Sequence, residues 1–380
     1  MLFTVVVILF AIGQTVKLIA PWLLDTNVVF YMMAFLFCMA LMHLTRGTFS
    51  QGWFSYSDET KIEILFAIKS AVASFVALKS FGSTAFFDFN IEKAHDESLV
   101  RVNSVMSLLG GKLNLPHDFT YGVLSLGAAV LTFATVRINI RFAYYFYVLT
   151  KNSATLLASR SDNTPEQVRY RRHLYLMYLN MLAPLLIAVF YLTPLVETLI
   201  VPDLLSESVW RLGRMVFVVG TVCLRLVTFR EEVQFHFNES YFYVQKLMTD
   251  KNEKIFRYIK LRIQENFLAT WYAVFQHSCN YALPILLVLA HVNRIVAFST
   301  LTETELSFPK AIEKMRSVPQ YDVMGDSEAL GQIFQEMSQK GLLTVEMYDC
   351  FYNYMIFWYY FSSTVVALFS LLYYRKFVGQ

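Results

Sequence analysis

Two asparagine–proline pairs are the residues of this chain whose types and spacing could do chemistry inside a membrane. Asn180 precedes Pro184, and Asn280 precedes Pro284, each by four residues within a long apolar run. A proline inside a helix has no N–H to offer the carbonyl of the residue four positions earlier, which here is the asparagine itself. Each pair therefore offers an amide side chain and a released carbonyl at one depth, which suits a water molecule, a cation or a guanidinium.

Ionisable residues in or beside the apolar runs complete the predicted buried polar centre, because charge at membrane depth is costly. Arg137 and Arg225 each end an apolar run that comes before an asparagine–proline run, and anchoring at the membrane surface is their alternative role. Lys69 lies in a run rich in alanine and serine, so it faces or borders a tight helix interface, or it extends to the headgroups. Lys17, Lys79 and Arg214 lie nearer span ends, and for them extension to the headgroups is favoured. His277 and His291 lie near the second asparagine; for them we favour hydrogen bonding between helices over proton transfer.

The elements that must position these residues are membrane-spanning helices. The chain is 56% hydrophobic and only 16% charged, whereas an average soluble domain has roughly 25% charged residues. Long apolar runs with few charges predict spans. We expect one all-α, polytopic membrane domain, residues 1–380, a helix bundle with eight spans near residues 2–23, 28–45, 62–81, 119–136, 174–201, 209–228, 267–298 and 347–374.

The charges of the connecting segments predict the orientation of the spans. Segments 137–172 and 225–262 are rich in Lys and Arg, whereas the outer loop 299–346 is acidic on balance. Since an excess of Lys and Arg marks the cytoplasmic side, both termini are expected in the cytoplasm. The apolar run at 1–13 resembles a signal peptide, but it has no basic start and continues past Lys17, so a retained span is favoured.

The order of the elements suggests a parallel internal repeat. Spans four and five and spans six and seven both read as an Arg-ended helix, a basic connection and an asparagine–proline helix. Such a repeat would relate the two halves by rotation about the membrane normal. A further helix is expected to begin at Thr164-Pro165-Glu166 and to continue into the fifth span. Outside the membrane, short helices are expected near residues 99–109 and 330–337.

No catalytic motif supports an enzyme. Nucleophile-elbow, phosphate-loop, dinucleotide and metalloprotease motifs are missing from the sequence, and the four cysteines are far apart, so neither a cofactor nor a metal is expected. The net charge of +3 is too small to indicate a nucleic-acid partner.

Two segments resemble the transmembrane protein 161 family: Tyr178-Leu-Asn-Met-Leu-Ala-Pro-Leu-Leu and Cys223-Leu-Arg-Leu. The similarity extends over nearly the whole chain, and Asn180, Pro184 and Arg225 match the family pattern. The resemblance implies a multi-pass membrane protein without enzymatic activity that restrains potassium and calcium currents in excitable cells. It supplies no ligand site. The chain departs from the family at its start, where members have a longer, partly polar segment.

Three functions therefore stand as hypotheses. The first is a non-enzymatic modulator of ion currents and membrane excitability that contacts ion-channel subunits or their regulators in the lipid bilayer. The second is a transporter or channel whose path is formed by the asparagine–proline helices. The third is a lipid-interacting protein that uses the basic cytoplasmic helices, because basic amphipathic segments suit an anionic inner leaflet.

Overall fold

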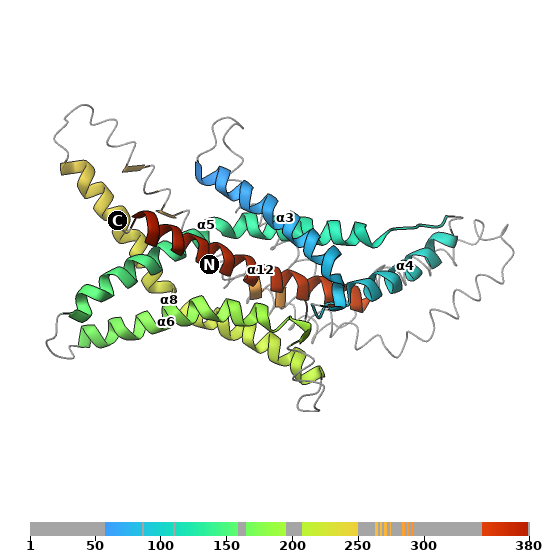
Figure 1. Cartoon of the computed structure of the whole chain (residues 1–380). Helices are drawn as coiled ribbons and strands as arrows, with labels where there is room; N and C mark the ends of the chain where they lie inside the picture. Colours follow the sequence, from blue (N-terminus) through green and yellow to red (C-terminus); the bar gives the residue numbers. More distant parts are fainter. Residues whose placement is uncertain are drawn as a thin grey trace, which may run out of the picture.

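The computed structural model describes residues 58–85, 87–108, 111–158, 165–194, 207–249 and 344–378, with isolated positions between 263 and 291. Nearly all of these residues are helical, and none of them lies in a β-strand (Figure 1). The helices are α3 (Asp58–Ala85), α4 (Ile91–Leu108), α5 (His117–Ala158), α6 (Pro165–Val189), α8 (Glu207–Thr249) and α12 (Val345–Tyr373), the last followed by a π-helical turn, Tyr374–Val378.

Five of these helices, α3, α5, α6, α8 and α12, are long and apolar enough to cross a membrane. They correspond to the third, fourth, fifth, sixth and eighth predicted spans. The predicted spans 2–23 and 28–45, most of 267–298 and nearly all of the loop 299–346 lie outside the described residues, as does the helix expected near 330–337. The membrane-helix class is confirmed for the described part; the number eight and the repeat stay predictions.

Three helix lengths differ from those predicted. α5 continues 22 residues past Val136 to Ala158, and α8 continues from Thr228 to Thr249, so part of each basic segment is helix instead of loop. α6 ends at Val189, well before residue 201. There the chain turns, and the backbone N–H of Asp88 donates to the carbonyl of Tyr191 at 3.1 Å. Hydropathy reports only average polarity, so it could not detect these tertiary contacts.

Two predicted helix boundaries are confirmed. α6 begins at Pro165, where a proline in the first turn loses no hydrogen bond. The helix expected near 99–109 is the second half of α4, which ends at Leu108, shortly before the glycine pair Gly110-Gly111 of the sequence. The chain enters α4 through Asn90, which has a positive φ of 50°. Asparagine tolerates this backbone conformation better than most residues.

α3 and α5 pack antiparallel along the length of α3. From one end of this seam to the other, the contacts are Lys79 with Asp118, Ser74 with Ser125, Ser70 with Thr132 and Glu63 with Arg137. Residue numbers fall on α3 as they rise on α5, which is the signature of an antiparallel pair. Hydroxyl groups line the middle of the seam, where small polar side chains let helices approach and hydrogen-bond.

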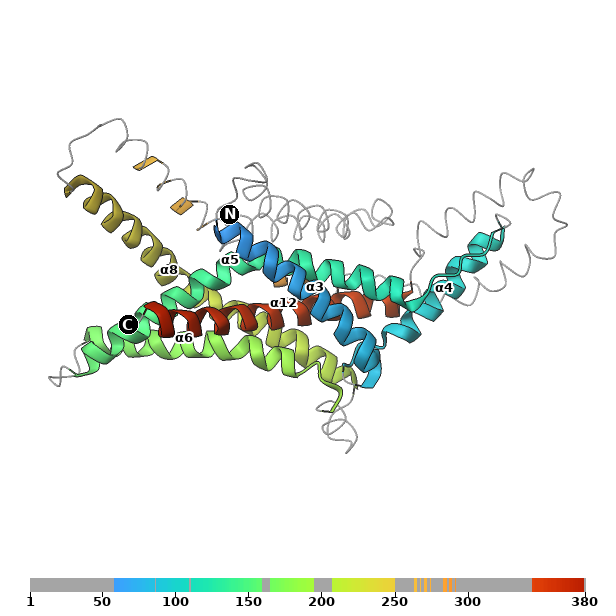
Figure 2. The same ribbon diagram turned by 45° about the horizontal axis from the view of Figure 1, so that its top comes forward.

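α12 runs through the middle of the described helices, with α5 on one side and α6 on the other (Figures 1 and 2). Its Trp358 donates to the Ser70 hydroxyl at 2.6 Å, and its Tyr354 hydrogen-bonds to Ser74. A Cβ on Gly127 of α5 would overlap the side chain of Met355, so glycine permits this close approach. α12 is therefore parallel to α5 and antiparallel to α3.

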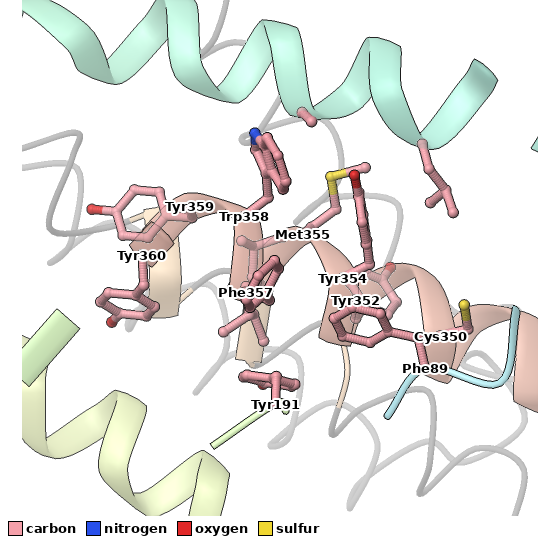
Figure 3. Close-up of a cluster of buried hydrophobic side chains, with 14 of the residues drawn as sticks. Phe89, Tyr191, Cys350, Tyr352, Tyr354, Met355, Phe357, Trp358, Tyr359 and Tyr360 are labelled. Atoms are coloured by element: carbon pink, nitrogen blue, oxygen red, sulfur yellow. The ribbon is translucent and has the colours of Figure 1, made fainter. Parts of the chain in front are cut away.

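The core around α12 combines aliphatic side chains with many aromatic ones. Figure 3 shows Phe357 next to Phe89 from the segment after α3 and to Tyr191 from the turn after α6. Their ring centroids lie 5.6 and 6.0 Å from that of Phe357, in the edge-to-face geometry that aromatic pairs favour. The aromatic residues therefore join α12 to two connecting segments at the same end of the bundle.

Candidate functional site

Arg137 forms a buried ion pair between α5 and α3. Its Nε donates to Oε1 of Glu63 at 2.5 Å, and the side chain of Glu63 is only 4% exposed. A carboxylate or a guanidinium that is shielded from solvent destabilises the fold when its partner is removed. This contact therefore stabilises the packing of the two helices. The arginine is predictable from the sequence, whereas its acidic partner is not, because Glu63 stands at the very edge of the predicted span.

Asn180 and Arg225 belong to a second site, between α6 and α8. The Asn180 side-chain amide donates to the Thr228 hydroxyl at 2.8 Å. That hydroxyl lies 2.9 Å from Oε1 of Glu232 and 3.0 Å from the carbonyl of Arg225, which share its single proton. Glu232 is 2% exposed and was also missed. One feature of the sequence could have indicated this contact: Thr228 and Glu232 are four residues apart, so they lie on the same face of a helix.

The guanidinium of Arg225 points to α12. Its Nη1 donates to the hydroxyl of Tyr359 at 3.1 Å, and its carbon lies 5.8 Å from the centre of the Tyr360 ring. Figure 3 shows these two tyrosines side by side on α12. Arg225 is 9% exposed, so the aromatic faces stabilise a charge that water reaches poorly. Arg137 contacts a carboxylate and Arg225 contacts phenols, so the two proposed equivalents have different partners.

The remaining predicted residues lie apart from these contacts or outside the described residues. Pro184 is buried, but α6 continues five residues beyond it, so this helix is not broken there. Pro284 is buried in a helical segment. Lys69 is exposed, and its neighbour Ser70 makes the helix contact, so of the two predicted positions Lys69 borders the α3–α5 seam and does not face into it. Asn280 and His277 lie outside the described residues.

A third group of charges, which we call the Arg214 group, joins α8, α12 and the segment after α3. It contains Asp88, Arg211, Arg214, His291 and Asp349. Arg214 lies 3.0 Å from Asp88, Arg211 lies 3.6 Å from Asp349, and His291 lies 2.8 Å from the same Asp349. The two carboxylates thus meet cations from α8, and the predicted hydrogen bond between helices for His291 is supported.

Arg214 corrects a second prediction. It was expected to extend to the membrane surface, but it is 6% exposed and its guanidinium carbon lies 4.9 Å from the centre of the Tyr191 ring. Burial raises the pKa of Tyr191, which Arg214 opposes, so the ring meets the guanidinium as a neutral phenol. Hydropathy places Arg214 close to a helix end, but it cannot show that Asp88, from a distant part of the chain, contacts the arginine.

Three residues, two from α4 and one from the start of α5, resemble a metal site and do not form one. Donor atoms of His95, Asp96 and His117 lie within 4.8 Å of one another. However, Nε2 of His95 lies 3.0 Å from the carbonyl of Leu115, which can only accept a hydrogen bond, so Nε2 carries the proton. Nδ1 then accepts from the Thr120 hydroxyl at 2.7 Å. Both nitrogens of His95 are engaged, which leaves too few donors for an ion.

A cavity of about 830 Å³ lies beside the Arg137–Glu63 pair. α3, α5, α8 and the end of α12 contribute to its wall, and we call it the Arg137 cavity. Its polar lining includes Glu63, Arg137, Arg141, His236, Glu239 and Ser240, and four tyrosines also line it. The cavity could not be predicted from the sequence, because its residues come from several helices that are distant in the chain.

The described part of the chain defines a class: an all-helical protein with five helices able to cross a membrane, which buried ionic and aromatic contacts hold together. No family model, curated protein or solved structure matches this chain.

Proposed function

We propose that this chain is a non-enzymatic, multi-pass membrane protein that restrains potassium and calcium currents by contacting channel subunits or their regulators. The observation that carries the proposal is the use of three buried or half-buried arginines. Arg137, Arg214 and Arg225 each reach a partner on another element, namely Glu63, Asp88 and Tyr359. Charges that pair between elements in this way stabilise the packing of the helices, and we call such a helix bundle a scaffold. A scaffold acts on other proteins through its outer surface.

The outer surface of the scaffold suits both lipid and a helical partner. α8 exposes Leu212, Val216 and Val227, and α3 exposes Ile68 and Val72. Exposed apolar helix faces of this kind pack against acyl chains or against other membrane helices. The resemblance described above supplies the class of partner, and the five candidate spans supply the environment.

The full topology is part of the same proposal: eight spans, two parallel halves and both termini in the cytoplasm. Relative helix direction supports it, because α5, α8 and α12 run one way and α3 and α6 the other, as the predicted order requires. The only glycosylation sequon, Asn238-Glu239-Ser240, would then face the cytoplasm and stay unmodified. A glycan on Asn238 would reverse the proposed orientation.

The test is a current recording combined with reconstitution. Expressing the chain in excitable cells is expected to lower potassium and calcium current densities, and proximity labelling is expected to recover channel subunits. Purified protein in liposomes is expected to conduct no cations. Unchanged currents in cells, or cation flux from the purified protein alone, would overturn the modulator proposal.

A transporter is the second candidate, and one observation favours it. The Oδ1 atom of Asn180 is buried without a hydrogen-bond partner among the described residues, one turn before Pro184. An amide oxygen and a carbonyl that proline deprives of its N–H could together bind a cation. Liposome flux that Asn180→Ala abolishes would support this candidate; flux that Asn180→Ala leaves unchanged would exclude this site as its path.

A further inference from the structure

The charges on the wall of the Arg137 cavity pair with one another. Arg137 donates to Glu63 at 2.5 Å. Arg141 interacts electrostatically with Glu239, which also lies 4.0 Å from His236. A charged ligand would have to disturb these pairs and leave a charge without its partner beside hydrocarbon, which is costly. The cavity therefore favours an uncharged ligand.

The apolar part of the lining reaches the outer surface of the bundle. α3 and α12 contribute most of it, namely Ile62, Leu65, Phe66, Phe369 and Tyr373. All of these except Phe66 are also exposed on helices that are long and apolar enough to cross a membrane. In a bilayer, acyl chains cover such a surface. A lipid can therefore enter the cavity sideways from the hydrocarbon layer without crossing water.

The cavity lies near one end of the spanning helices. Arg137 lies 20 residues from the first residue of α5, and Phe66 lies 19 residues from the last residue of α3. At 1.5 Å per residue both lengths are about 30 Å, the thickness of the hydrocarbon layer of a bilayer. Because α3 and α5 are antiparallel, both lengths start from the same end of the bundle. When that end lies at one membrane surface, the cavity lies near the other, where amphipathic lipids keep their polar groups.

Aromatic rings and hydroxyl groups complete the lining. Tyr144 and Tyr374 line the cavity with ring centroids 5.3 Å apart, and Ser240 and Ser370 line it as well. An aromatic ring offers a flat apolar face, and a serine hydroxyl can both donate and accept a hydrogen bond. The volume of about 830 Å³ falls within the range of roughly 300–1,000 Å³ for small-molecule sites. The lining therefore suits an uncharged ligand with a flat apolar body and one hydroxyl group, which is the chemistry of a sterol.

Two short sequence patterns associated with sterol contact meet at this cavity. Residues 371–375, Leu-Leu-Tyr-Tyr-Arg, have the order aliphatic, tyrosine, basic, and residues 141–148, Arg-Phe-Ala-Tyr-Tyr-Phe-Tyr-Val, have the reverse order. Either pattern alone is common by chance and carries little weight. Here the tyrosines of both patterns, Tyr373 and Tyr144, line one cavity although they come from different helices. The fold therefore brings the two patterns to one site.

We propose that the Arg137 cavity binds one membrane sterol, with its ring system against the tyrosines and the apolar residues of α3 and α12 and its hydroxyl group at the serines. This inference goes beyond the proposed function and does not rest on it, because a modulator and a transporter could each hold such a lipid. Diacylglycerol shares the neutral charge and the hydroxyl group but has no rigid rings. It is therefore the competing ligand that the test must distinguish.

The test is photolabelling of the full-length protein in phosphatidylcholine vesicles with a photoreactive cholesterol analogue. Labelled peptides are expected to contain the cavity residues of α3 and α12, such as Leu65 and Tyr373. Excess cholesterol is expected to suppress the label, whereas the same amount of diacylglycerol is expected to leave it unchanged. Equal suppression by diacylglycerol, or labelling of the described helices only outside the cavity, would overturn the proposal.

Two variants change the cavity itself. Ser370→Phe fills it without changing its charge and is expected to abolish labelling. Tyr373→Ala removes an aromatic wall at an exposed position, so it is expected to leave the fold intact and to weaken binding about tenfold. A thermal melt checks that each variant is folded. If Ser370→Phe does not fold, Tyr373→Ala and the map of labelled peptides decide the question.

Two control variants separate the cavity from general lipid contact and from the sequence pattern alone. Leu372→Ala changes an exposed residue of α12 that does not line the cavity, and it is expected to leave labelling unchanged. Arg375→Gln breaks the pattern at residues 371–375, but Arg375 does not line the cavity either, so the same result is expected. Equal labelling in all variants, or loss in Arg375→Gln with full labelling in Ser370→Phe, would overturn the cavity as the sterol site.

Discussion

The Arg214 group and the Arg137 cavity contain the same kinds of side chain and differ in what fills the space around them. In the Arg214 group, Tyr191 covers the guanidinium and two carboxylates meet the cations, so the charges are packed against protein. In the Arg137 cavity, one pair is closed by Glu63, while about 830 Å³ beside it is open. Packed charges stabilise a fold, whereas charges around a space can bind a ligand.

The largest expected effect comes from the packed group. Arg214→Gln removes the cation that faces Asp88 at 3.0 Å and that lies over the Tyr191 ring. Breaking a buried ion pair by removing one partner costs about 3–5 kcal/mol. Because the Asp88 side chain is 28% exposed, a loss near the lower end of that range is expected in the free energy of unfolding. Reversible unfolding in SDS from mixed micelles measures it.

Arg211→Gln is the matched control for this prediction. Arg211 also contacts a carboxylate of the group, but its side chain is 49% exposed and its distance to Asp349 is 3.6 Å. Exposed pairs contribute about 0–1 kcal/mol. If the two variants lose equal stability, the description of Arg214 as a packed charge is wrong.

A smaller loss is expected at the cavity. Glu63→Gln leaves Arg137 without its carboxylate, but the guanidinium borders an open space where water or a headgroup can solvate it. The expected cost is about 1–3 kcal/mol, below that of Arg214→Gln. The double variant with Arg137→Gln should lose less than the sum of the two single variants, since both report one contact. Additive losses, or a loss larger than that of Arg214→Gln, would erase the contrast between packed and open charges.

The sequence predicts the ends of some helices well because local chemistry determines them. Thr164-Pro165-Glu166 marks the start of α6, and the glycine pair marks the end of α4. The same sequence placed the end of the fourth span at Val136, because Arg137 and Arg141 lower the local hydropathy. Arg137 pairs with Glu63 on α3 and Arg141 lines the cavity, and α5 continues through both residues to Ala158.

The candidate site was predictable only in part, for a related reason. Pattern reasoning found Arg137, Asn180 and Arg225 because each is polar within an apolar run. It missed Glu63, Asp88 and Asp349 because acidic residues at span ends look like ordinary surface charges. Which charge meets which depends on helix packing, and a single sequence does not contain that information in local form.

An intermediate effect is expected between α6 and α8. Asn180→Leu removes the amide that donates to Thr228 at 2.8 Å, and the hydroxyl and Glu232 lose one member of their chain of hydrogen bonds. A net loss of about 1 kcal/mol in the free energy of unfolding is expected. Leu179→Ala, at the exposed neighbouring position, should cost less. An unchanged or increased stability of Asn180→Leu would show that the amide is kept for a ligand and not for packing.

The smallest effect is expected at the opposite end of the seam that Glu63 and Arg137 close. Lys79 and Asp118 also join α3 to α5, at 2.8 Å, but their side chains are 56% and 53% exposed. Lys79→Gln should cost less than about 1 kcal/mol, and the difference from wild type should vanish near 1 M salt, where the screening length is about 3 Å. The cost of Glu63→Gln should persist at that salt concentration, because a pair enclosed by two helices is screened much less. The two pairs join the same helices and differ in their exposure to solvent. If both costs depended on salt in the same way, exposure would not be the cause of their different contributions to stability.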